Sequence, residues 1–390
     1  MLKAQTGAST NPDSAKAGRE AASKAKAGLA GIKLAFVYSG IQYDQKKLLE
    51  GISAELPGVP LIGNTSFTGV ITPEGFITGD NGFVGILAIS DPDLAIGRAG
   101  LAKVNGDARE TGRKAAQAAI ANAKAGDQAP SQFYMVAPPG EEELYLKGVS
   151  DIIGRVPVFG GSAADNEIAG KWLLFTDEVV TADGVAVAFF YSKAPRAHIF
   201  TGAYEETKNA GVITKIKGNR TLVEIDGLPA IKKYADWTGN ALPALTGSNL
   251  LVTTITAPLG VKDRLGELVA IRHPMFGNDD QSMEIGANLA VNTAVIQMSG
   301  SVEGLVASAS AKVKELLGSL GGATPGALVL VHCGGRRAGI GDRIGEVAAG
   351  IKREAGDIPF IVNFTFGEYG YHDDGNNTTG GLMLSYTALS

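Results

Sequence analysis

Short apolar runs alternate with helical patterns along this chain, and the stretch from Ala327 to Gly370 contains one complete cycle. The apolar run at 328–331 is rich in β-branched residues and too short for a lone helix, so it predicts a buried strand. A polar, glycine-rich turn follows at 332–337, and a helical pattern then ends near Gly356. A second apolar run at 359–362 completes a unit of strand, turn, helix and strand.

The same unit occurs three times, with a constant distance between the glycine of its helix and the proline that enters its second strand. The first copy begins at Leu34 and the second at Phe133. Nine positions separate glycine and proline in every copy, at Gly51 and Pro60, Gly148 and Pro157, and Gly350 and Pro359. This spacing fixes how far each helix runs before the chain turns back, so it indicates an internal structural repeat.

The repeat extends beyond these units on both sides. An Ala-rich helical pattern precedes each copy and a strand that starts on glycine follows it, at 18–22, 112–116 and, more loosely, 304–317, and at 82–90, 184–192 and 380–388. We therefore predict three units of roughly 80–90 residues, with residues 192–300 as a non-repeating insert. The fold class predicted is α/β, with two lobes of mixed or parallel sheet flanked by helices.

The length of 390 residues allows about two or three domains. We assign residues 1–30 to an N-terminal helical segment and expect a boundary between two halves near residue 226, just before a helix that begins near Pro229. The sequence at 373–376 is typical of a solvated turn, because its acidic residues lack the alternation of a calcium-binding loop.

Charge and cysteine content exclude several classes of function. A net charge of −5 without a basic stripe argues against nucleic acid as a partner. A single cysteine excludes an intramolecular disulfide and a cysteine-based metal cage. The N-terminus has no apolar signal region, and the long uncharged runs are interrupted by polar residues, so we expect a soluble cytoplasmic protein without membrane insertion.

Small and polar residues follow the apolar strands at their carboxyl ends, where parallel α/β sheets form ligand crevices. We predict one ligand-binding site there, between the two halves, formed by Asn64, Thr65, Ser66, Gly161, Ser162, Cys333, Gly335, Arg336, Asn363, Thr365 and Glu368. The alternative is that small residues at these strand ends only permit a tight turn or a close approach of strands.

Arg336 and Glu368 give the predicted site its charge. A glycine-rich link from strand to helix leaves backbone N–H groups free, and the guanidinium adds a fork suited to a carboxylate or phosphate. Glu368 ends the neighbouring strand, so we expect it to pair with a ligand ammonium or with Arg336 itself. Ile340 and Gly341 replace the Lys and Ser or Thr of a Walker loop, which argues against a nucleotide. A structural pairing of the arginine is the alternative.

An enzymatic alternative is a hydrolase or transferase that uses Cys333 or Glu368. His332 adjoins the cysteine, but neighbouring residues of a strand point to opposite faces, so this histidine is not placed to activate the thiol. We therefore assign no catalytic residue. The histidines form no close pair in the sequence and predict no metal site; they are His198, His273, His332 and His372.

Two segments of the chain resemble the FIST family, which has an N-terminal and a C-terminal FIST domain. They are LAFVYSG followed by KLLEGISAELPGVPLIGNTSFTGV, and VHCGGRRAGIG followed by IPFIVNFTFGEYG. The most specific residues are Cys333, Gly335 and Arg336, followed by Gly367 and Glu368. The resemblance extends over about residues 32–389 and places the N-terminal domain at 31–225 and the C-terminal domain at 226–390. The segment 362–364 departs from the usual glycine and aromatic of the family, which concerns the ligand pocket.

The resemblance implies a sensory protein of signal transduction that binds small molecules, with amino-acid-like ligands proposed for the family. Some members look like haem proteins that sense nitric oxide and modulate a histidine kinase or a diguanylate cyclase. If this chain binds haem, His332 is the expected ligand, because it ends an apolar strand. We favour a cytoplasmic sensor of an amino-acid-like or other small anionic metabolite, with a separate signalling enzyme as its partner.

Overall fold

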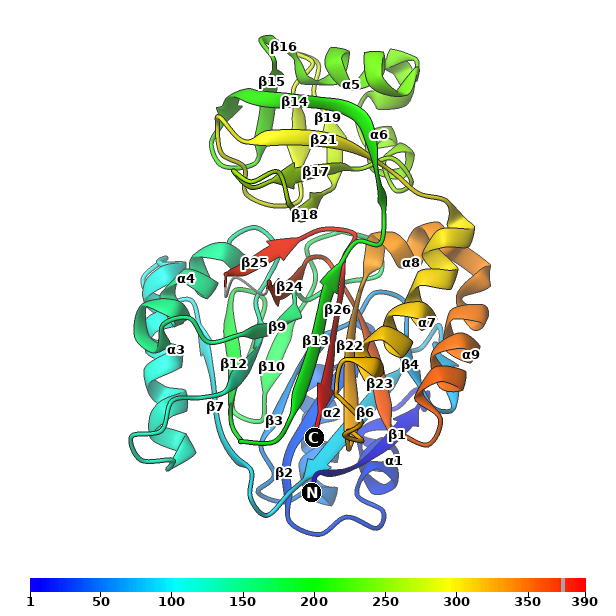
Figure 1. Ribbon diagram of the computed structural model, residues 1–390. Coiled ribbons are helices and arrows are strands. Elements are labelled where there is room, and N and C mark those ends of the chain that lie inside the picture. Colours follow the sequence, from blue (N-terminus) through cyan, green and yellow to red (C-terminus); the bar gives the residue numbers. More distant parts are fainter. Residues whose placement is uncertain (373–375) are drawn as a thin grey trace.

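The computed structural model describes residues 1–372 and 376–390, and three units with one order of elements build most of it (Figure 1). Unit 1 contains β1 (Lys3–Ser9), α1 (Ser14–Ala25), β2 (Ile32–Ser39), α2 (Gln45–Glu55), β3 (Leu61–Thr65), β4 (Val70–Thr72), β5 (Gly75–Ile77) and β6 (Val84–Ser90). Unit 2 contains β7 (Ala95–Ala102), α3 (Ala108–Ala123), β8 (Gln132–Val136), α4 (Glu142–Ile153), β9 (Val158–Gly161), β10 (Leu174–Thr176), β11 (Val180–Thr181) and β12 (Gly184–Tyr191).

Unit 3 repeats this order but carries an inserted domain after its first strand. It contains β13 (Arg196–Thr201), α7 (Val302–Gly318), β22 (Ala327–Cys333), α8 (Gly334–Ile340), the 3₁₀ turn η2 (Gly341–Arg343), α9 (Ile344–Ala355), β23 (Phe360–Thr365), β24 (Glu368–Tyr371), β25 (Asn377–Gly380) and β26 (Leu384–Leu389). The turn predicted at 373–376 falls mainly on residues outside the described ones.

Each unit receives the last two strands of its sheet from another unit. The three sheets have one strand order, which is β1-β6-β2-β3-β10-β11, β7-β12-β8-β9-β24-β25 and β13-β26-β22-β23-β4-β5. In every sheet the two central strands that a helical crossover connects are parallel, namely β2 and β3, β8 and β9, and β22 and β23. The strand received from another unit pairs antiparallel with the second strand of each pair. The hairpins therefore pass in a closed ring, from unit 1 to unit 3, from unit 3 to unit 2 and from unit 2 to unit 1.

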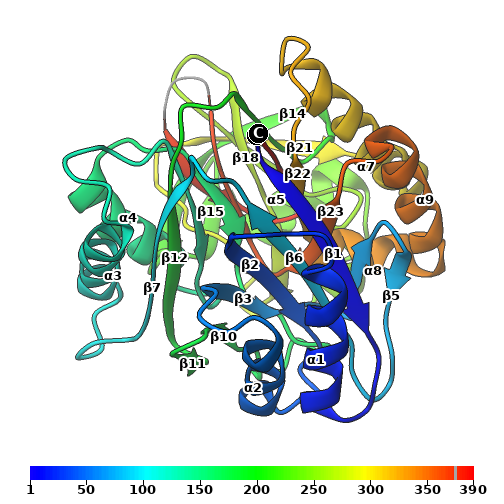
Figure 2. The ribbon, with the colours of Figure 1, turned by 90° about the horizontal axis from the view of Figure 1, so that it is seen from below.

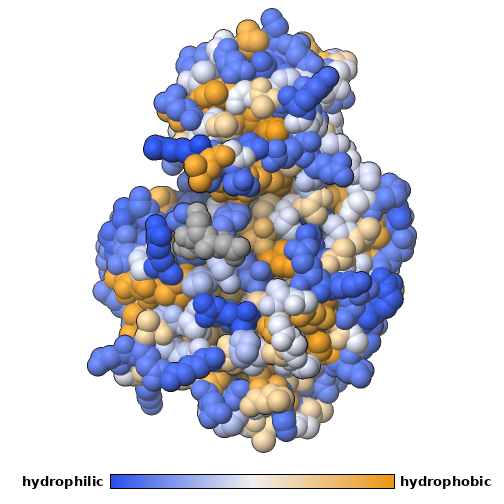
Figure 3. All heavy atoms as spheres, in the orientation of Figure 1, coloured by the Kyte–Doolittle hydropathy of each residue, from blue (hydrophilic) through white to orange (hydrophobic). Residues whose placement is uncertain are grey.

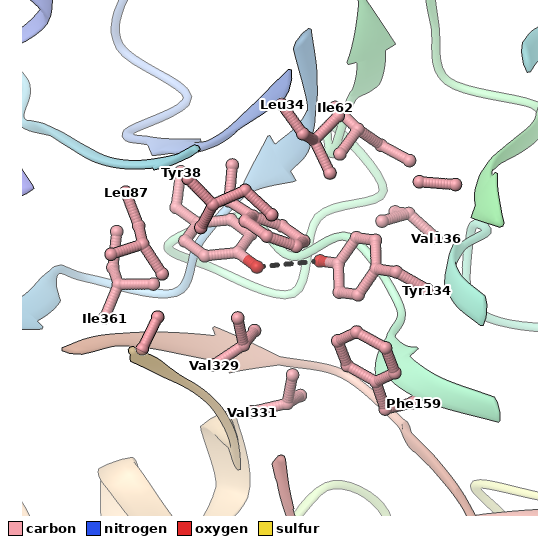
Figure 4. Packing of buried hydrophobic residues seen from close by; sticks show 14 of the residues in the cluster. Leu34, Tyr38, Ile62, Leu87, Tyr134, Val136, Phe159, Val329, Val331 and Ile361 are labelled. Carbon is pink, nitrogen blue, oxygen red and sulfur yellow. Dashed lines mark hydrogen bonds between the residues drawn. The ribbon is translucent and has the colours of Figure 1, made fainter. Parts of the chain in front are cut away.

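The three sheets enclose a common apolar core, and helix pairs cover their outer faces (Figure 2). Tyr38 of β2 and Tyr134 of β8 point into this core, where their hydroxyls are hydrogen bonded at 3.0 Å, and Val331 of β22 faces them (Figure 4). The intervening residues, such as Val37 and Met135, pack against the helices outside. These strands are buried on both faces, which explains their continuous apolar sequences.

Glycine determines how closely the helices approach in two of the three outer pairs. In the α1/α2 pair, a Cβ on Gly51 would lie 2.1 Å from the carbonyl oxygen of Ala15. In the α3/α4 pair, a Cβ on Gly148 would lie 2.0 Å from the carbonyl oxygen of Arg109. In the third pair Gly350 faces a serine side chain of α7 at 3.0 Å, a looser contact. The repeated glycine is therefore the residue at which the two helices of a unit cross.

The inserted domain, which we call the insert, occupies residues 202–300 and stands on the three-unit lobe (Figure 1). It contains β14 (Glu205–Lys217), β15 (Thr221–Ile225), β16 (Leu228–Pro229), α5 (Ala230–Thr238), the 3₁₀ turn η1 (Leu242–Leu245), α6 (Asn249–Thr253), β17 (Leu259–Lys262), β18 (Leu268–Arg272), β19 (Pro274–Gly277), β20 (Met283–Ile285) and β21 (Ala294–Ser299). Its antiparallel strands pack on α5 and α6 around a separate apolar core. Within the described residues, no helix is long and apolar enough to cross a membrane.

The predicted α/β class and the three internal repeats are confirmed, while several boundaries differ. The segment 1–30, predicted as helical, also contains β1, whose polar sequence gives no strand signal and which is held by pairing with β6. The predicted insert began too early, because β13 belongs to unit 3 and pairs with β26. Residue 226, near which we expected a boundary between two halves, lies between β15 and β16 of the insert, and the division of the chain there stays a prediction.

Substitution of the crossing glycine tests this account of the helix pairs. We expect Gly51→Ala to destabilise the protein by about 1–3 kcal/mol, because the new Cβ overlaps a backbone carbonyl that has no freedom to rotate away. Urea denaturation measures this change. Gly345→Ala in α9 is the matched control, since no atom lies within 4 Å of its Cβ, and it should stabilise by about 0.5–1 kcal/mol. Equal midpoints for the two variants would contradict the crossing role.

Candidate functional site

A cavity of about 260 Å³ lies between the lobe and the insert, at the carboxyl ends of the central strands of the lobe. The lobe contributes Phe67, Pro139, Gly140, Ile168, Trp172, Cys333, Gly334, Gly335, Ala338, Phe366 and Gly381, and the insert contributes Arg220, Leu251, His273, Met275 and Gly286. Pockets for drug-sized ligands begin at about 300 Å³. The cavity is slightly smaller, so its size suits a ligand smaller than a typical drug molecule.

Three aromatic residues, one from each unit, form the apolar wall of the cavity. The ring of Phe366 lies 5.6 Å from that of Phe67 and 6.2 Å from that of Trp172, measured between ring centroids. Each residue stands in the link between the third strand of its unit and the hairpin that the unit donates. The exchange of hairpins therefore brings these three links to one place.

Cys333 ends β22 and contributes its side chain to the cavity lining. Its sulfur accepts hydrogen bonds from the backbone N–H of Gly335 at 3.3 Å and of Leu382 at 3.1 Å. Burial, with the nearby Glu368 carboxylate in addition, raises the pKa of this thiol well above its usual range. His332 lies on the opposite face of the strand, against the ring of Phe364, as strand alternation requires.

Glu368 is fully buried beneath the cavity and is held by its neighbours in the chain. Its carboxylate accepts hydrogen bonds from the hydroxyl of Thr365 at 2.8 Å and from the backbone N–H of Met383 at 2.9 Å. Burial raises the pKa of Glu368 to about 8, and these hydrogen bonds and the neighbouring Cys333 oppose the rise only in part. The carboxyl group is therefore largely protonated at neutral pH.

The remaining small and polar residues of the predicted site form a buried layer between the core and the cavity. Asn363 donates to the side-chain oxygen of Asn64 at 3.0 Å, and the hydroxyl of Ser66 accepts from the backbone N–H of Phe364 at 3.0 Å. The other members also bond within the protein: Thr65 to Leu173, Ser162 to Tyr369, and Gly161 as the strand partner of Glu368. The structure thus brings these residues together, as a layer that supports the floor of the cavity.

Arg336 is fully buried, and its two terminal nitrogens bond to protein atoms while Nε has no hydrogen-bond partner among the described residues. The group donates to the carbonyl oxygens of Gly202 and Leu305 and to the hydroxyl of Ser308, and it lies 5.8 Å from the ring centroid of Tyr204. Gly202 and Tyr204 belong to the link from β13 into the insert. The side chain that we predicted as an anion anchor lies outside the cavity lining and fastens the base of the insert to the lobe.

His273 and Arg220 are the polar side chains that the insert adds to the cavity, and we did not predict either. The Nε2 atom of His273 lies 3.0 Å from the carbonyl oxygen of Leu251, and burial lowers the pKa of the imidazole to about 4. The neutral ring therefore donates from Nε2, which leaves Nδ1 as an acceptor without a partner in the described part of the chain. The aromatic wall did leave a signal in the repeat, since Phe67 and Phe366 each stand seven positions after the strand-entry proline.

Arg220 joins the insert to the N-terminus of α4 at the edge of the cavity. Its Nη2 atom lies 2.9 Å from a carboxylate oxygen of Glu142 and also pairs with Glu143. The other nitrogens donate to the side chain of Asn288 and to the carbonyl oxygen of Gly286, both at 3.2 Å. Burial raises the pKa of Glu142 to about 7, with Glu143 adding to the rise and Arg220 opposing it.

The cavity does not fit haem, which certain relatives of this fold are expected to carry. Its volume of about 260 Å³ is below that of a pocket for a drug-sized molecule, and a macrocycle needs more. His332, the expected ligand, lies outside the cavity lining. Among the described residues, no group of three or more His, Cys, Asp or Glu side chains is arranged to hold a metal ion.

The lobe and the insert define an α/β protein of two parts with a cavity between them. The chain belongs to the FIST family, since the FIST N domain matches residues 33–228 and the FIST C domain matches residues 230–371. FIST domains are in general small-molecule-sensing domains of signal transduction. No curated protein matches the sequence.

Solved structures give weak likenesses over the whole chain. A cyanuric acid hydrolase from A. caulinodans is 12% identical with a TM-score of 0.37, and both chains are covered completely. Another cyanuric acid hydrolase is 10% identical with a TM-score of 0.35, again over 100% of both chains. PurLQS from Thermotoga maritima is 10% identical with a TM-score of 0.21, over 99% of this chain and 72% of the other. At these values the likenesses carry no inference about chemistry.

The environment of Cys333 predicts a slow reaction with thiol reagents. Because the pKa of the thiol is raised, its thiolate fraction should stay low through the pH range near 8.5 in which a free cysteine ionises. Iodoacetamide labelling of the native protein, followed by mass spectrometry from neutral to alkaline pH, measures this. The same chain in urea is the control, since its single cysteine is then exposed. Equal labelling rates in the native and unfolded protein would contradict the raised pKa.

Glu368 predicts a particular dependence of stability on pH. Its pKa is raised from 4.5 to about 8, so the folded protein keeps a proton that the unfolded chain releases between these values. This contribution to stability is complete below pH 4.5 and is lost as the pH rises towards 8. Glu368→Gln should therefore flatten the fall in unfolding free energy over this window, on the order of 1 kcal/mol or more.

The matched control is the exposed Glu50→Gln on α2, which should retain the pH dependence of the parent protein. Part of the dependence should also remain in Glu368→Gln, because the pKa of Glu142 is raised as well. Chemical denaturation at several pH values makes the comparison. A variant at position 368 with the same slope as the parent protein would show that Glu368 is ionised in the native state.

Proposed function

We propose that this chain is a sensor whose cavity binds one small metabolite, with the lobe and the insert closing on it together. The observation that carries the proposal is that the cavity is lined by all three units and by the insert. A ligand there contacts both parts at once, so its binding energy stabilises one arrangement of the insert on the lobe. Membership of a family of sensory domains supports this assignment.

The cavity favours a ligand with an apolar or aromatic body and one or two polar groups. Phe67, Trp172 and Phe366 offer ring faces to the body. The free Nδ1 of His273 accepts a hydrogen bond from a ligand N–H or O–H, and Arg220 is the cation nearest to a ligand carboxylate. An amino-acid-like or other small carboxylic ligand with an apolar side chain satisfies all three requirements.

The residues predicted from the sequence take three roles in this proposal. Cys333 and Gly335 contact the ligand directly, because both line the cavity. Arg336 fastens the insert to the lobe. The others support the floor of the cavity: Asn64, Thr65, Ser66, Gly161, Ser162, Asn363, Thr365 and Glu368. A thiol nucleophile finds no support here, because burial raises the pKa of Cys333 and His332 lies on the opposite face of the strand.

Signal output is proposed to pass to a separate enzyme, such as a histidine kinase or a diguanylate cyclase, in the cytoplasm. The three units and the insert account for the described elements, and each is used to build the cavity or its supports. A ligand that fixes the insert on the lobe changes the surface at their junction, which such a partner can recognise.

Tryptophan fluorescence tests the proposed cavity while the identity of the ligand is still open. The chain has two tryptophans, of which Trp172 lines the cavity and Trp237 lies in α5 of the insert. In a Trp237→Phe background, amino acids and small organic acids are screened, and we expect one of them to give a saturable change in Trp172 emission. The active compound should produce no such change in the Trp172→Phe variant.

Filling the cavity should then remove binding. Ala338→Phe adds a ring to the cavity lining, and we expect the affinity for the active compound to fall at least tenfold, or by about 1.4 kcal/mol. Ala311→Phe, on the exposed face of α7 and outside the lining, is the matched control and should bind as the parent protein does. Equal affinity in both variants would move the binding site elsewhere.

A further inference from the structure

A second depression, which we call the cleft, lies beside the cavity, between α4 and the insert (Figure 3 shows the waist at which the two parts meet). It has a volume of about 430 Å³, and its lining includes Glu143, Lys147, Arg155, Arg272 and Asn288. A hydrogen-bonded pair separates it from the cavity, since Arg220 lines the cavity and Glu143 lines the cleft. Among the described residues, the linings of the cleft and the cavity have no member in common, although Glu143 and Asn288 of the cleft hold Arg220 of the cavity.

Arg272, at the end of β18, is the central feature of the cleft and is only 8% exposed. Its Nε donates to the carbonyl oxygen of Asn288 at 3.1 Å, and its Nη1 donates to those of Thr379 at 2.9 Å and Ile271 at 3.3 Å. These bonds join the insert to β25 of the lobe. The third nitrogen, Nη2, has no hydrogen-bond partner within residues 1–372 and 376–390, so it is left for the cleft.

The charges around Arg272 are unbalanced. Lys147 on α4 and Arg155 after it are exposed, and neither has an ion-pair partner in the part of the chain that the structure describes. Glu143 is the carboxylate of the lining, and it is already bonded to Arg220, to the backbone N–H of Asn288 and to the hydroxyl of Thr379. Among the described residues of the lining, three cations thus face one occupied carboxylate, which gives this part of the cleft a positive field in a chain whose net charge is −5.

A purely structural role accounts for two of the three guanidinium nitrogens but leaves the charge only partly compensated. The acceptors of Nε and Nη1 are main-chain carbonyls, which carry no formal charge. Burial lowers the pKa of Arg272 to about 10, which the carboxylate of Glu143 only partly opposes, so the group is still a cation at neutral pH. An anion that approaches the free N–H groups of such a buried cation stabilises it.

We propose that the cleft is a second binding site, at which Arg272, Lys147 and Arg155 hold a small oxyanion, namely a phosphate or carboxylate group of a metabolite. The buried fork of Arg272 contributes the fixed contact, and the two exposed cations complete the charge. Such a ligand contacts α4 of the lobe and β18 of the insert together. It therefore tightens the junction beside the cavity without entering the cavity.

Calorimetric titration at constant ionic strength tests the site, with inorganic phosphate in one arm and the dicarboxylate succinate in the other. We expect saturable binding in at least one arm, and the arm that binds identifies the oxyanion. The double variant Lys147→Ala/Arg155→Ala should bind at least about tenfold more weakly, because two charged contacts are lost. Arg19→Ala, an exposed arginine on α1 without an ion-pair partner among the described residues, is the control and should bind as the parent protein does.

Arg272→Lys keeps the charge but removes the fork, and it should weaken binding at least as much as the double variant does. If Arg272→Lys fails to fold, the double variant still decides the question, since its residues are exposed. The proposal is overturned if neither phosphate nor succinate binds saturably at millimolar concentration. It is equally overturned if Arg19→Ala weakens binding as much as the double variant, because the effect is then one of overall charge.

Discussion

The exchange of hairpins among the three units is the constraint on which the rest of the structure depends. A short strand such as β4 pairs with β23 of another unit, and the same relation holds for β10 with β3 and β24 with β9. Each exchange pairs the backbone N–H and C=O groups at the open edge of one sheet. It also places the link that precedes the donated hairpin across the end of the common core. Since the ring is closed, moving one unit relative to another breaks strand pairs rather than sliding apolar surfaces.

This constraint also explains why the end of the core is polar yet rigid. The donated links meet there, and their amide, hydroxyl and carboxyl groups satisfy one another in a dry environment, as Asn64 with Asn363 and Thr365 with Glu368 show. The layer separates the apolar core from the cavity and leaves few hydrogen-bonding atoms for a ligand. Recognition then depends on side chains above the layer, namely the aromatic wall of the lobe and the polar residues of the insert.

The sequence predicted the architecture better than the site, and the residues show why. The glycine-to-proline spacing reports local geometry, since Gly51 and Gly148 lie at helix crossings within one unit. The donated strands have only two to four residues and pair with another unit, so they leave no periodic signal. Arg336 looked like a ligand residue because its acceptors, Gly202 and Leu305, are distant in the sequence.

The contributions of the insert were beyond prediction for the same reason. Arg220 and His273 stand in no repeat, and their position over the lobe depends on how the insert is anchored. The predicted residues do gather at one end of the lobe, because parallel strands deliver their carboxyl ends to one edge. Which of them face a ligand is determined by hydrogen bonds within the layer, and these require the three-dimensional arrangement.

The closed ring has a consequence for the order of events during synthesis. Ser66, beside the first donated hairpin, bonds to Phe364, which follows 298 positions later, so this contact must wait until almost the whole chain has left the ribosome. Until then β4 and β5 have no partner sheet, and β3 presents an open edge until β10 arrives. Long-range closure of this kind is slow, so the nascent chain depends on the early helix pair α1/α2 to keep its apolar strands covered.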